Sequence, residues 1–413
     1  MRSINVRKRG YLNYNLSCYS AKTKLLLITI SFLLFNSCHH NNKNMSKIFE
    51  FDPEVLTDNS ITLNKIADEI VYVPFDTLIK IGSVYSYRLI DDFIYLSVKD
   101  VGILLYTRSG KFIKKIGNPG RGPGEYYHFM YFDVDPKSRY LYVIDRNIIK
   151  IYDSEGVYKN SVSINDQYLS YISYFNDKLI ISDFNHYGIS EYNWITLDTN
   201  GILIKKKENY IPPFKSTLPS HGGNYVFNNN LHYWNLYCDT IFSIRPDLSY
   251  TVSFIIKEGK FRWPKSNIKV APTESFRSYL LNHLFISLIL ETKQFIILRY
   301  TYKNIMIVLL DKFSKKSYMT YLYNHEGSVE LYGGILNDID GGVPFKPEVY
   351  LYENEYEYLV ELIYPYTIKK HIQSIDFKNS SPKYPEKKKD FQKLADNMKE
   401  TDNPVLVLVR LKD

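Results

Sequence analysis

The chain has 413 residues, of which 45% are apolar and 16% aromatic, with 39 tyrosines and 23 phenylalanines. This length permits a large core, and the aromatic content favours β-sheet. Residues 1–37 contain six of the 52 basic residues and no acidic residue. The rest of the chain therefore has 46 basic and 44 acidic residues, a net charge of +2. A nearly neutral protein gives no electrostatic case for binding nucleic acid, which requires a clustered basic face.

The N-terminus has the pattern of an export signal. A basic region precedes the apolar run 25–35, which ends in Asn36-Ser37-Cys38. Eleven apolar residues are too few to span a bilayer stably. The ending resembles a bacterial lipoprotein signal, which implies that residues 1–37 are the signal peptide and that Cys38 is lipidated. The protein would then lie in the cell envelope, periplasmic or at the outer-membrane surface, and would contact the membrane only through its N-terminal lipid. An uncleaved or ordinarily cleaved signal is the alternative.

Residues 38–49, which begin Cys38-His39-His40-Asn41-Asn42, are predicted to be a flexible tether, and residues 50–413 the folded domain. Cys18 leaves with the signal peptide and Cys38 would carry lipid, so only Cys238 remains. An intramolecular disulfide is therefore excluded, and stability has to come from the core.

The sequence predicts a short apolar strand at 70–75. A repeating unit follows, which consists of one strand and then two further strands joined by a turn. The turn glycines Gly110, Gly156 and Gly201 are 46 and 45 residues apart. This period is typical of β-propellers, in which each repeat forms one four-stranded blade.

Later units are less regular, because the turns within 229–247 and 295–311 lack glycine. With a last unit at roughly 331 to 411, the pattern predicts an all-β fold. We expect a six-bladed β-propeller of four-stranded antiparallel blades with short helical insertions, at 264–290 and 390–399. The final run 405–411 is almost wholly apolar and is predicted to be a buried strand. It should share a blade with the strand at 70–75 and so close the ring.

Two loops hold the candidate binding residues. Residues 117–125 contain four glycines and two prolines and must form a shaped loop, which presents Arg121 and Glu125. A phosphate-binding loop is not expected, because no helix start and no Gly-Lys-Ser/Thr sequence follows. Residues 337–345 form a second loop with Asp338 and Asp340, which does not fit the calcium-loop pattern.

Residues 120–126, 337–345 and 402–406 together resemble motifs of the six-bladed β-propeller lipoproteins of Bacteroidetes. The resemblance covers roughly residues 50 to 413. It implies a propeller fold and an envelope location. It implies no reaction, because most members of that family lack an assigned activity.

In a propeller, the loop with Arg121 and Glu125 opens onto one face near the central channel. The Arg121 guanidinium is then either a clamp for an anionic ligand or a link between neighbouring blades. Asp338 and Asp340 either contact a cation or sugar hydroxyls, or cap a turn. These four residues are the candidate ligand-binding residues.

Two functions remain open. The first is a lipid-anchored binding or scaffold module for a glycan, peptide or protein partner. The second is a propeller enzyme, a metal-assisted lyase or hydrolase acting at the channel mouth. It would draw on four histidines from different units, whose spacing matches no local zinc motif: His128, His186, His221 and His232. We assign no metal, cofactor or catalytic residue.

Overall fold

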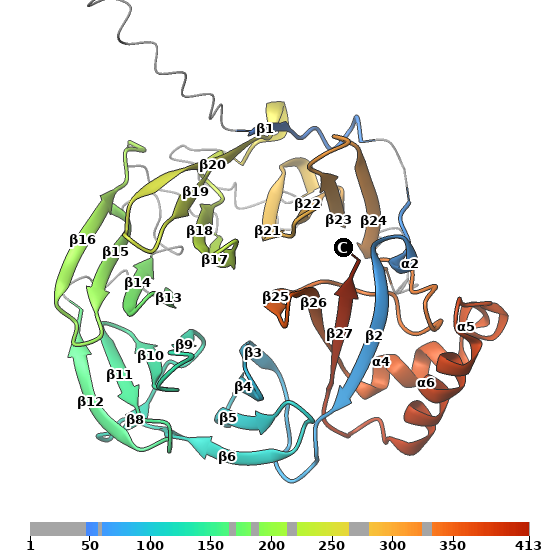
Figure 1. The fold of residues 1–413 in the computed structure, drawn as a ribbon, viewed down its shortest axis with the longest axis horizontal. Helices are drawn as coiled ribbons and strands as arrows, with labels where there is room; N and C mark the ends of the chain where they lie inside the picture. Colours follow the sequence, from blue (N-terminus) through green and yellow to red (C-terminus); the bar gives the residue numbers. More distant parts are fainter. Residues whose placement is uncertain are drawn as a thin grey trace, which may run out of the picture. The chain divides into compact units, whose positions relative to one another are not determined.

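The computed structural model describes residues 47–56, 60–164, 171–182, 190–212, 221–263, 281–323 and 333–412. The predicted signal peptide, Cys38 and the tether as far as residue 46 lie outside these ranges. Most of the described strands form six sheets of four antiparallel strands around a central axis, with one parallel strand added to blade 4 (Figure 1). The short strands β7 (Asn118–Pro119) and β8 (Glu125–Tyr126) form a separate two-stranded parallel sheet. The predicted six-bladed β-propeller is therefore confirmed.

Each blade is built from four strands in order from the axis outwards, and blades 1 to 5 are continuous in sequence. The strands are β3 (Val84–Ile90), β4 (Phe93–Val98), β5 (Gly102–Thr107) and β6 (Phe112–Ile116) in blade 1; β9 (Phe132–Val134), β10 (Leu141–Asp145), β11 (Ile148–Tyr152) and β12 (Tyr158–Ser163) in blade 2; β13 (Tyr171–Phe175), β14 (Lys178–Ser182), β15 (Tyr192–Asp198) and β16 (Leu203–Glu208) in blade 3; β17 (Gly222–Phe227), β18 (Asn230–Asn235), β19 (Thr240–Ile244) and β20 (Tyr250–Lys257) in blade 4; and β21 (Phe285–Glu291), β22 (Phe295–Tyr302), β23 (Asn304–Asp311) and β24 (Ser317–Tyr323) in blade 5.

Blade 6 combines the two ends of the domain. Its inner strands are β25 (Val349–Glu353), β26 (Tyr356–Ile363) and β27 (Val405–Leu411), and its outermost strand is β2 (Ala67–Pro74). Strand β2 pairs antiparallel with β27, with Ile70 opposite Val409 (Figure 1). The predicted closure of the ring by strands from both ends is confirmed.

The segment before β2 follows the outside of the ring. Strand β1 (Lys47–Glu50) pairs in parallel with β20 as a fifth strand of blade 4. It begins at Lys47, so it includes residues expected to belong to the tether. Phe51 is buried against Tyr300 of blade 5 at a ring distance of 5.0 Å, and the short helix α2 (Leu63–Ile66) precedes β2.

The core consists of six apolar clusters, one at each interface between neighbouring blades. Successive side chains of a strand point to opposite faces, so each strand contributes to two interfaces. In β27, Val405, Val407 and Val409 face blade 5, whereas Leu406 and Leu408 face blade 1. This double burial explains why residues 405–411 are apolar almost throughout.

The helices α4 (Pro365–Gln373), α5 (Ile375–Asn379) and α6 (Pro385–Asn397) lie outside the ring between β26 and β27 (Figure 1). The predicted helix 390–399 is α6, which begins five residues earlier because Pro385 suits the first helical turn. The predicted insertion at 264–290 is wrong at its end, since 285–290 belong to strand β21. Residues 264–280 lie outside the described ranges.

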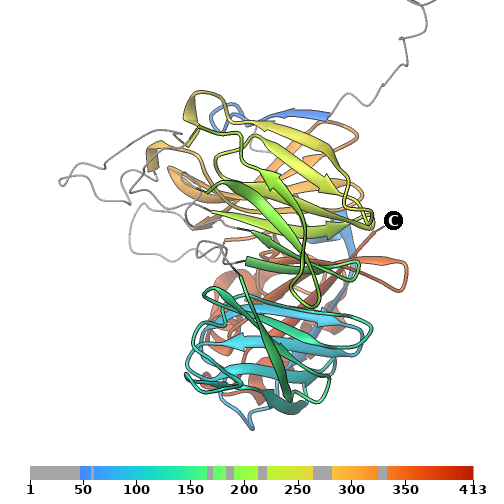
Figure 2. The same cartoon turned by 90° about the vertical axis from the view of Figure 1, so that its left-hand side faces the viewer.

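Antiparallel order within a blade places its turns at two ends of the ring, which Figure 2 shows edge-on. The turns between first and second strands and between third and fourth strands lie at one end. The turns between second and third strands lie at the other, together with the connections from blade to blade. We call this second end the connection end.

Candidate functional site

The glycine-rich loop lies at the connection end between blades 1 and 2 and folds over the buried ring of Tyr126. The Tyr126 hydroxyl donates to the Ile116 carbonyl at 2.6 Å and accepts from the Ile103 amide at 2.8 Å. Gly117 and Gly124 have φ angles of 62° and 73°, which glycine adopts without strain. The loop is therefore held to blade 1 through Tyr126 and to blade 2 through the Tyr152 hydroxyl, which donates to the Gly124 carbonyl at 3.0 Å.

The two candidate residues of this loop, Arg121 and Glu125, make separate contacts. Glu125 Oε2 accepts a hydrogen bond from the Gly122 amide at 2.8 Å, so this carboxylate closes its own loop. Arg121 is exposed, and its guanidinium lies 5.3 Å from the ring centre of Tyr127. Among the described residues, Arg121 has neither an ion pair nor a hydrogen bond to a neighbouring blade, so the expected link between blades is not found there.

The loop with Asp338 and Asp340 lies away from the channel, against the N-terminal segment. Asp338 accepts from the Asn64 amide at 2.8 Å. Asp340 accepts from the Gly342 amide at 2.8 Å and from the Tyr72 hydroxyl at 3.3 Å, and burial raises the pKa of this carboxyl. Asp338 thus caps the start of α2, whereas Asp340 caps its own turn and contacts Tyr72 of β2.

The histidines considered for a metal site do not converge. His128 is exposed at the connection end, His221 lines the channel, and His232 is buried between blades 4 and 5. His186 lies outside the described residues. Within the described ranges, no group of three His, Cys, Asp or Glu side chains is placed to hold a metal ion.

The central channel is a cavity with a volume of about 1330 Å³. It is lined by the innermost strand of every blade, and its wall includes nine tyrosines. The Tyr131 and Tyr171 rings of neighbouring blades lie 4.8 Å apart. A cavity of this size with an aromatic wall and a few polar groups has the character of a ligand site.

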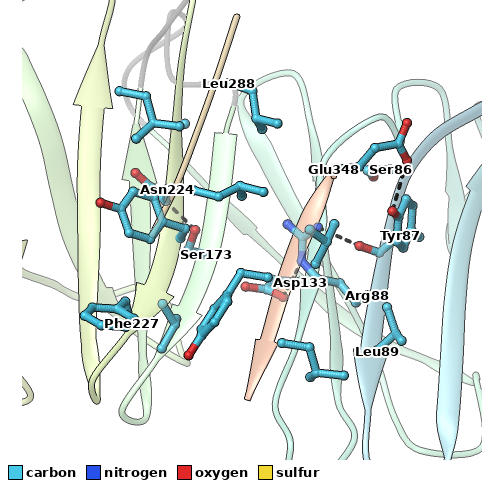
Figure 3. A pocket seen from close by; sticks show the side chains of 18 of the residues that line it. Ser86, Tyr87, Arg88, Leu89, Asp133, Ser173, Asn224, Phe227, Leu288 and Glu348 are labelled. Carbon is cyan, nitrogen blue, oxygen red and sulfur yellow. Dashed lines mark hydrogen bonds and ion pairs between the residues drawn. The ribbon is translucent and has the colours of Figure 1, made fainter. Parts of the chain in front are cut away.

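One ion pair in the channel wall joins three blades. Arg88 Nε of β3 lies 3.0 Å from Asp133 Oδ1 of β9, as Figure 3 shows. Asp133 Oδ2 accepts from the Tyr174 amide of β13 at 2.8 Å. The Asp133 carboxylate raises the pKa of Arg88 against the effect of burial. This pair presents a fixed, neutralised polar surface rather than a reactive group.

Buried carboxyls lie where blade 6 meets blades 1 and 5. Glu348 lines the channel and accepts from the Tyr87 hydroxyl at 3.0 Å (Figure 3). Glu361, fully buried behind it, accepts from the Lys346 amide at 2.8 Å. Burial raises the pKa of Glu348, and burial together with the Glu348 charge raises the pKa of Glu361 well above its ordinary value. The Arg299 guanidinium opposes both shifts without an ion pair to either carboxyl within 4 Å.

A polar pair on β13 and β17 leaves one acceptor unused. Asn224 Nδ2 donates to Ser173 Oγ at 3.1 Å (Figure 3). The amide oxygen Oδ1 of Asn224 is buried and has no hydrogen-bond partner among the described residues. An unsatisfied buried acceptor is costly and commonly marks the place of a water or a ligand donor.

Sequence reasoning missed all these channel residues. Most of them lie on the first strand of a blade. The partners in blades 1 to 4 are 41 to 51 residues apart, about one repeat, whereas Tyr87 and Glu348 are 261 residues apart. The blade period of about 45 residues is the signal in the sequence that could have found them. Arg88 and Asp133 are one period apart, so they occupy equivalent positions on the innermost strands of neighbouring blades, where they form an ion pair.

The ring of six blades with an aromatic channel defines a six-bladed β-propeller with a central ligand-sized cavity. The chain belongs to the family described as domain of unknown function DUF4934, which matches residues 46–410. No curated protein matches the sequence.

Two of the solved structures similar to this chain come from Bacteroides. A protein of Bacteroides fragilis that is thought to be exported is 17% identical, with a TM-score of 0.64 over 89% of this chain and 100% of that chain. A member of the DUF4221 family from Bacteroides vulgatus is 12% identical, with a TM-score of 0.46 over 86% of this chain and 99% of that one. At this identity the first likeness shows the fold alone. Within the described residues, none of the helices has the length and apolar character needed to cross a membrane.

Proposed function

We propose that the protein is a lipid-anchored binding module of the cell envelope and that its ligand is a glycan bound in the central channel. The observation that carries this proposal is the channel itself, about 1330 Å³ in volume and lined by tyrosines from several blades. Tyrosine rings pack against the apolar face of a sugar ring, while their hydroxyls stay available for hydrogen bonds.

The polar groups of the channel fit a hydroxyl-rich ligand. Arg88 and Asp133 neutralise each other, so they offer hydrogen bonds without a net charge. The unused Asn224 oxygen can accept from a ligand hydroxyl. A rigid wall of this kind binds with little loss of conformational freedom, which favours affinity.

The proposal can be tested by a substitution that places a large side chain in the channel. Val226 lies on β17, lines the channel and is 49% exposed, so Val226→Trp should occupy ligand volume without disturbing the core. We expect a panel of oligosaccharides to bind residues 46–413, and the substitution to lower the affinity of the best ligand about tenfold or more through steric exclusion. Val157→Trp is the control, because Val157 is 57% exposed in an outer turn of blade 2.

A panel that shows no binding of any oligosaccharide, or equal binding by Val226→Trp and wild type, would contradict the proposal. Selective binding of peptides instead would replace the glycan with another class of ligand. Asn224→Ala adds a finer measurement, since loss of one accepted hydrogen bond should weaken binding by about 1 kcal/mol.

The anchor is a separate part of the proposal, supported by the apolar run 25–35 that ends in Ser37-Cys38. Cells grown with a labelled fatty-acid analogue should label the wild-type protein and not Cys38→Ala. Equal labelling of the two would show that the anchor is not attached at this cysteine.

A further inference from the structure

We propose that Arg121, Arg146 and Tyr127 form a binding site for an oxyanion at the connection end of the ring, which we call the rim site. The oxyanion is a carboxylate or sulfate group. The proposal rests on the proposed function in one respect, namely that this group belongs to the ligand of the channel.

The rim site is a cluster of two cations on one exposed ring. Tyr127 is 49% exposed, and the guanidinium groups of Arg121 and Arg146 lie 5.3 Å and 4.9 Å from its ring centre. Both arginines are exposed. Arg121 comes from the glycine-rich loop and Arg146 from the turn between β10 and β11, so two separate segments each place a cation against the same ring.

The platform under these cations is fixed by Asp145. Its two carboxylate oxygens accept from the Tyr127 and His128 amides, each at 3.0 Å, and the carboxylate lies 3.8 Å from Lys150 Nζ. The Asp145 side chain is only 10% exposed. The Asp145 carboxylate therefore bonds to the loop backbone and to Lys150, and it does not form an ion pair with Arg121 or Arg146.

The two guanidinium groups lack partners in the described part of the chain. Neither has a carboxylate oxygen within 4 Å, although Arg88, Arg262 and Arg410 form such pairs elsewhere. A guanidinium group without a carboxylate partner gains an ion pair when an anion binds. Guanidinium forms paired hydrogen bonds with carboxylate and sulfate, which makes these groups the expected ligands.

The hollow beside the rim site and the channel share one wall residue, Tyr85. Arg121 and Tyr127 line a second hollow of about 510 Å³, whose wall also includes Tyr85 and Asp100. Tyr85 lines the central channel as well. A ligand that leaves the channel over Tyr85 thus meets Arg121, and an acidic sugar residue is the part of a glycan that would stop there.

The first experiment tests the rim site without any glycan. The probe is inorganic sulfate, and the readout is the rise in melting temperature of residues 46–413 relative to sodium chloride of equal ionic strength. The test variant is Arg121→Gln/Arg146→Asn, which removes both cations while asparagine suits the φ of 59° at position 146. We expect about a tenfold loss of sulfate affinity, the sum of two exposed charge interactions.

Two further variants sharpen this comparison. Lys111→Gln/Lys137→Gln removes the same charge from exposed positions elsewhere and should respond to sulfate as wild type does. Asp100→Asn removes the acidic group of the hollow at a left-handed position that asparagine tolerates, so sulfate should bind more tightly. An equal sulfate response in wild type and the Arg121/Arg146 variant would overturn the rim site and leave the channel proposal untouched.

The second experiment links the two sites with a matched pair of ligands, trigalacturonate and its methyl ester. Wild type should prefer the acid, and the Arg121/Arg146 variant should bind acid and ester equally. Val226→Trp should lose both sugars and keep the sulfate response. Preference for the acid in the Arg121/Arg146 variant would contradict the rim site, whereas failure of both sugars with an intact sulfate response would contradict only its link to the channel.

Discussion

In each of the five blades whose two outer strands are consecutive, the turn between them contains one residue with a left-handed backbone. Glycine occupies this position in blades 1 to 3, with φ of 84° at Gly110, 79° at Gly156 and 87° at Gly201. Leu248 and Lys315 occupy it in blades 4 and 5, with φ of 64° and 60°. The turns that look degraded in the sequence therefore keep the same geometry, at the cost of strain in a side-chain-bearing residue.

These turns also contact the preceding blade. A Cβ at Gly110 would collide with the Pro74 carbonyl of blade 6, and a Cβ at Gly201 would collide with Val162 of blade 2. The glycines of the repeat therefore serve two needs, backbone conformation and close approach of neighbouring blades.

Gly110→Ala should separate these two needs when it is compared with Gly259→Ala. Gly259 also has a positive φ, of 60°, but a Cβ there would meet nothing within 4 Å. We expect Gly259→Ala to cost about 1 kcal/mol from backbone strain, and Gly110→Ala to cost about 2–4 kcal/mol because the collision adds to it. Denaturant unfolding of both variants measures the difference, and equal costs would show that the close contact relaxes.

The buried carboxyl of Glu361 makes a prediction about pH. Burial raises its pKa in the folded state well above the ordinary value of 4.5, so the folded protein holds a proton that the unfolded chain releases. The protonated Glu361 carboxyl therefore makes its full contribution to stability below pH 4.5. This contribution is lost as the pH rises through the pKa of this carboxyl in the folded state. Glu361→Gln should match wild type near pH 4.5 and unfold at a higher temperature than wild type at pH 8.

The difference between variant and wild type is the quantity to measure across this pH range. Burial lowers the pKa values of His221, His232 and His371, which destabilises both proteins alike below about pH 6.5, so these histidines cancel. The exposed Glu400→Gln changes the net charge equally and is the control. A difference that does not grow with pH would contradict the assignment of Glu361.

For single residues, the sequence predicts the kind of element in which a residue lies better than it predicts the residues that it contacts. The composition of residues 117–125 places Arg121 in an exposed loop, where the structure has it. It does not predict Arg146 as a neighbour, because that contact depends on how blade 2 packs against the loop. Asp338 and Asp340 are correctly expected in a loop, but their contacts with Asn64 and Tyr72 arise only when the ring closes.

At the level of elements, the strands with regular turns are predictable and the insertions are not. Periodicity and glycine spacing predict the outer strands of blades 1 to 3, and continuous apolar character predicts β27. The spacing of Phe276, Leu280, Leu281 and Leu284 resembles a helix, and Leu281 is helical in the structure, but the helical segment ends before β21 begins at Phe285. A short apolar run fits either period when both faces of a strand are buried.

The two N-terminal strands should differ in importance. Removing residues 1–51 deletes β1 and Phe51 but leaves six four-stranded blades, so we expect a soluble monomer that melts at a lower temperature. Removing residues 1–75 also deletes β2 and exposes the edge of β27, so we expect aggregation.

The same aggregation is expected when residues 404–413 are removed, because β2 then loses its partner. Size-exclusion chromatography and melting curves distinguish these outcomes. A soluble, monomeric protein without β2 or without β27, with unchanged melting, would contradict the importance of the mixed blade.

For the whole molecule, the question is how a ring of separate blades becomes one cooperative unit. Each apolar cluster joins only two neighbouring blades, and blade 6 provides the clusters with both blade 5 and blade 1. The backbone hydrogen bonds between β2 and β27 join the two ends of the domain within that blade.

Two circular permutants test whether a blade made from both ends of the chain increases the thermal stability of the ring. In both, residues 1–60 are removed and the C-terminus is joined to Ile61 by a short linker, since Lys412 N already lies 2.9 Å from the Ile66 carbonyl. A chain opened between Thr199 and Asn200 starts with β16 and ends with β15, so blade 3 is mixed. A chain opened between Tyr210 and Ile211 has every blade continuous.

We expect the first permutant to have the higher melting temperature, because breaking its ring requires separating two hydrogen-bonded strands. The second can open by parting two blades at an apolar interface. Equal melting temperatures and equal denaturant slopes would show that packing between blades is sufficient.

The pairing of β2 with β27 also sets an order of events during synthesis. Strand β2 leaves the ribosome near the start of the domain, whereas its partner is among the last residues to appear. Until then Ile70 and its neighbours have no sheet to join, so the nascent chain carries an open strand throughout translation. A ribosome that stalls before residue 405 releases a chain that cannot close, which makes every incomplete copy a target for chaperones and proteases.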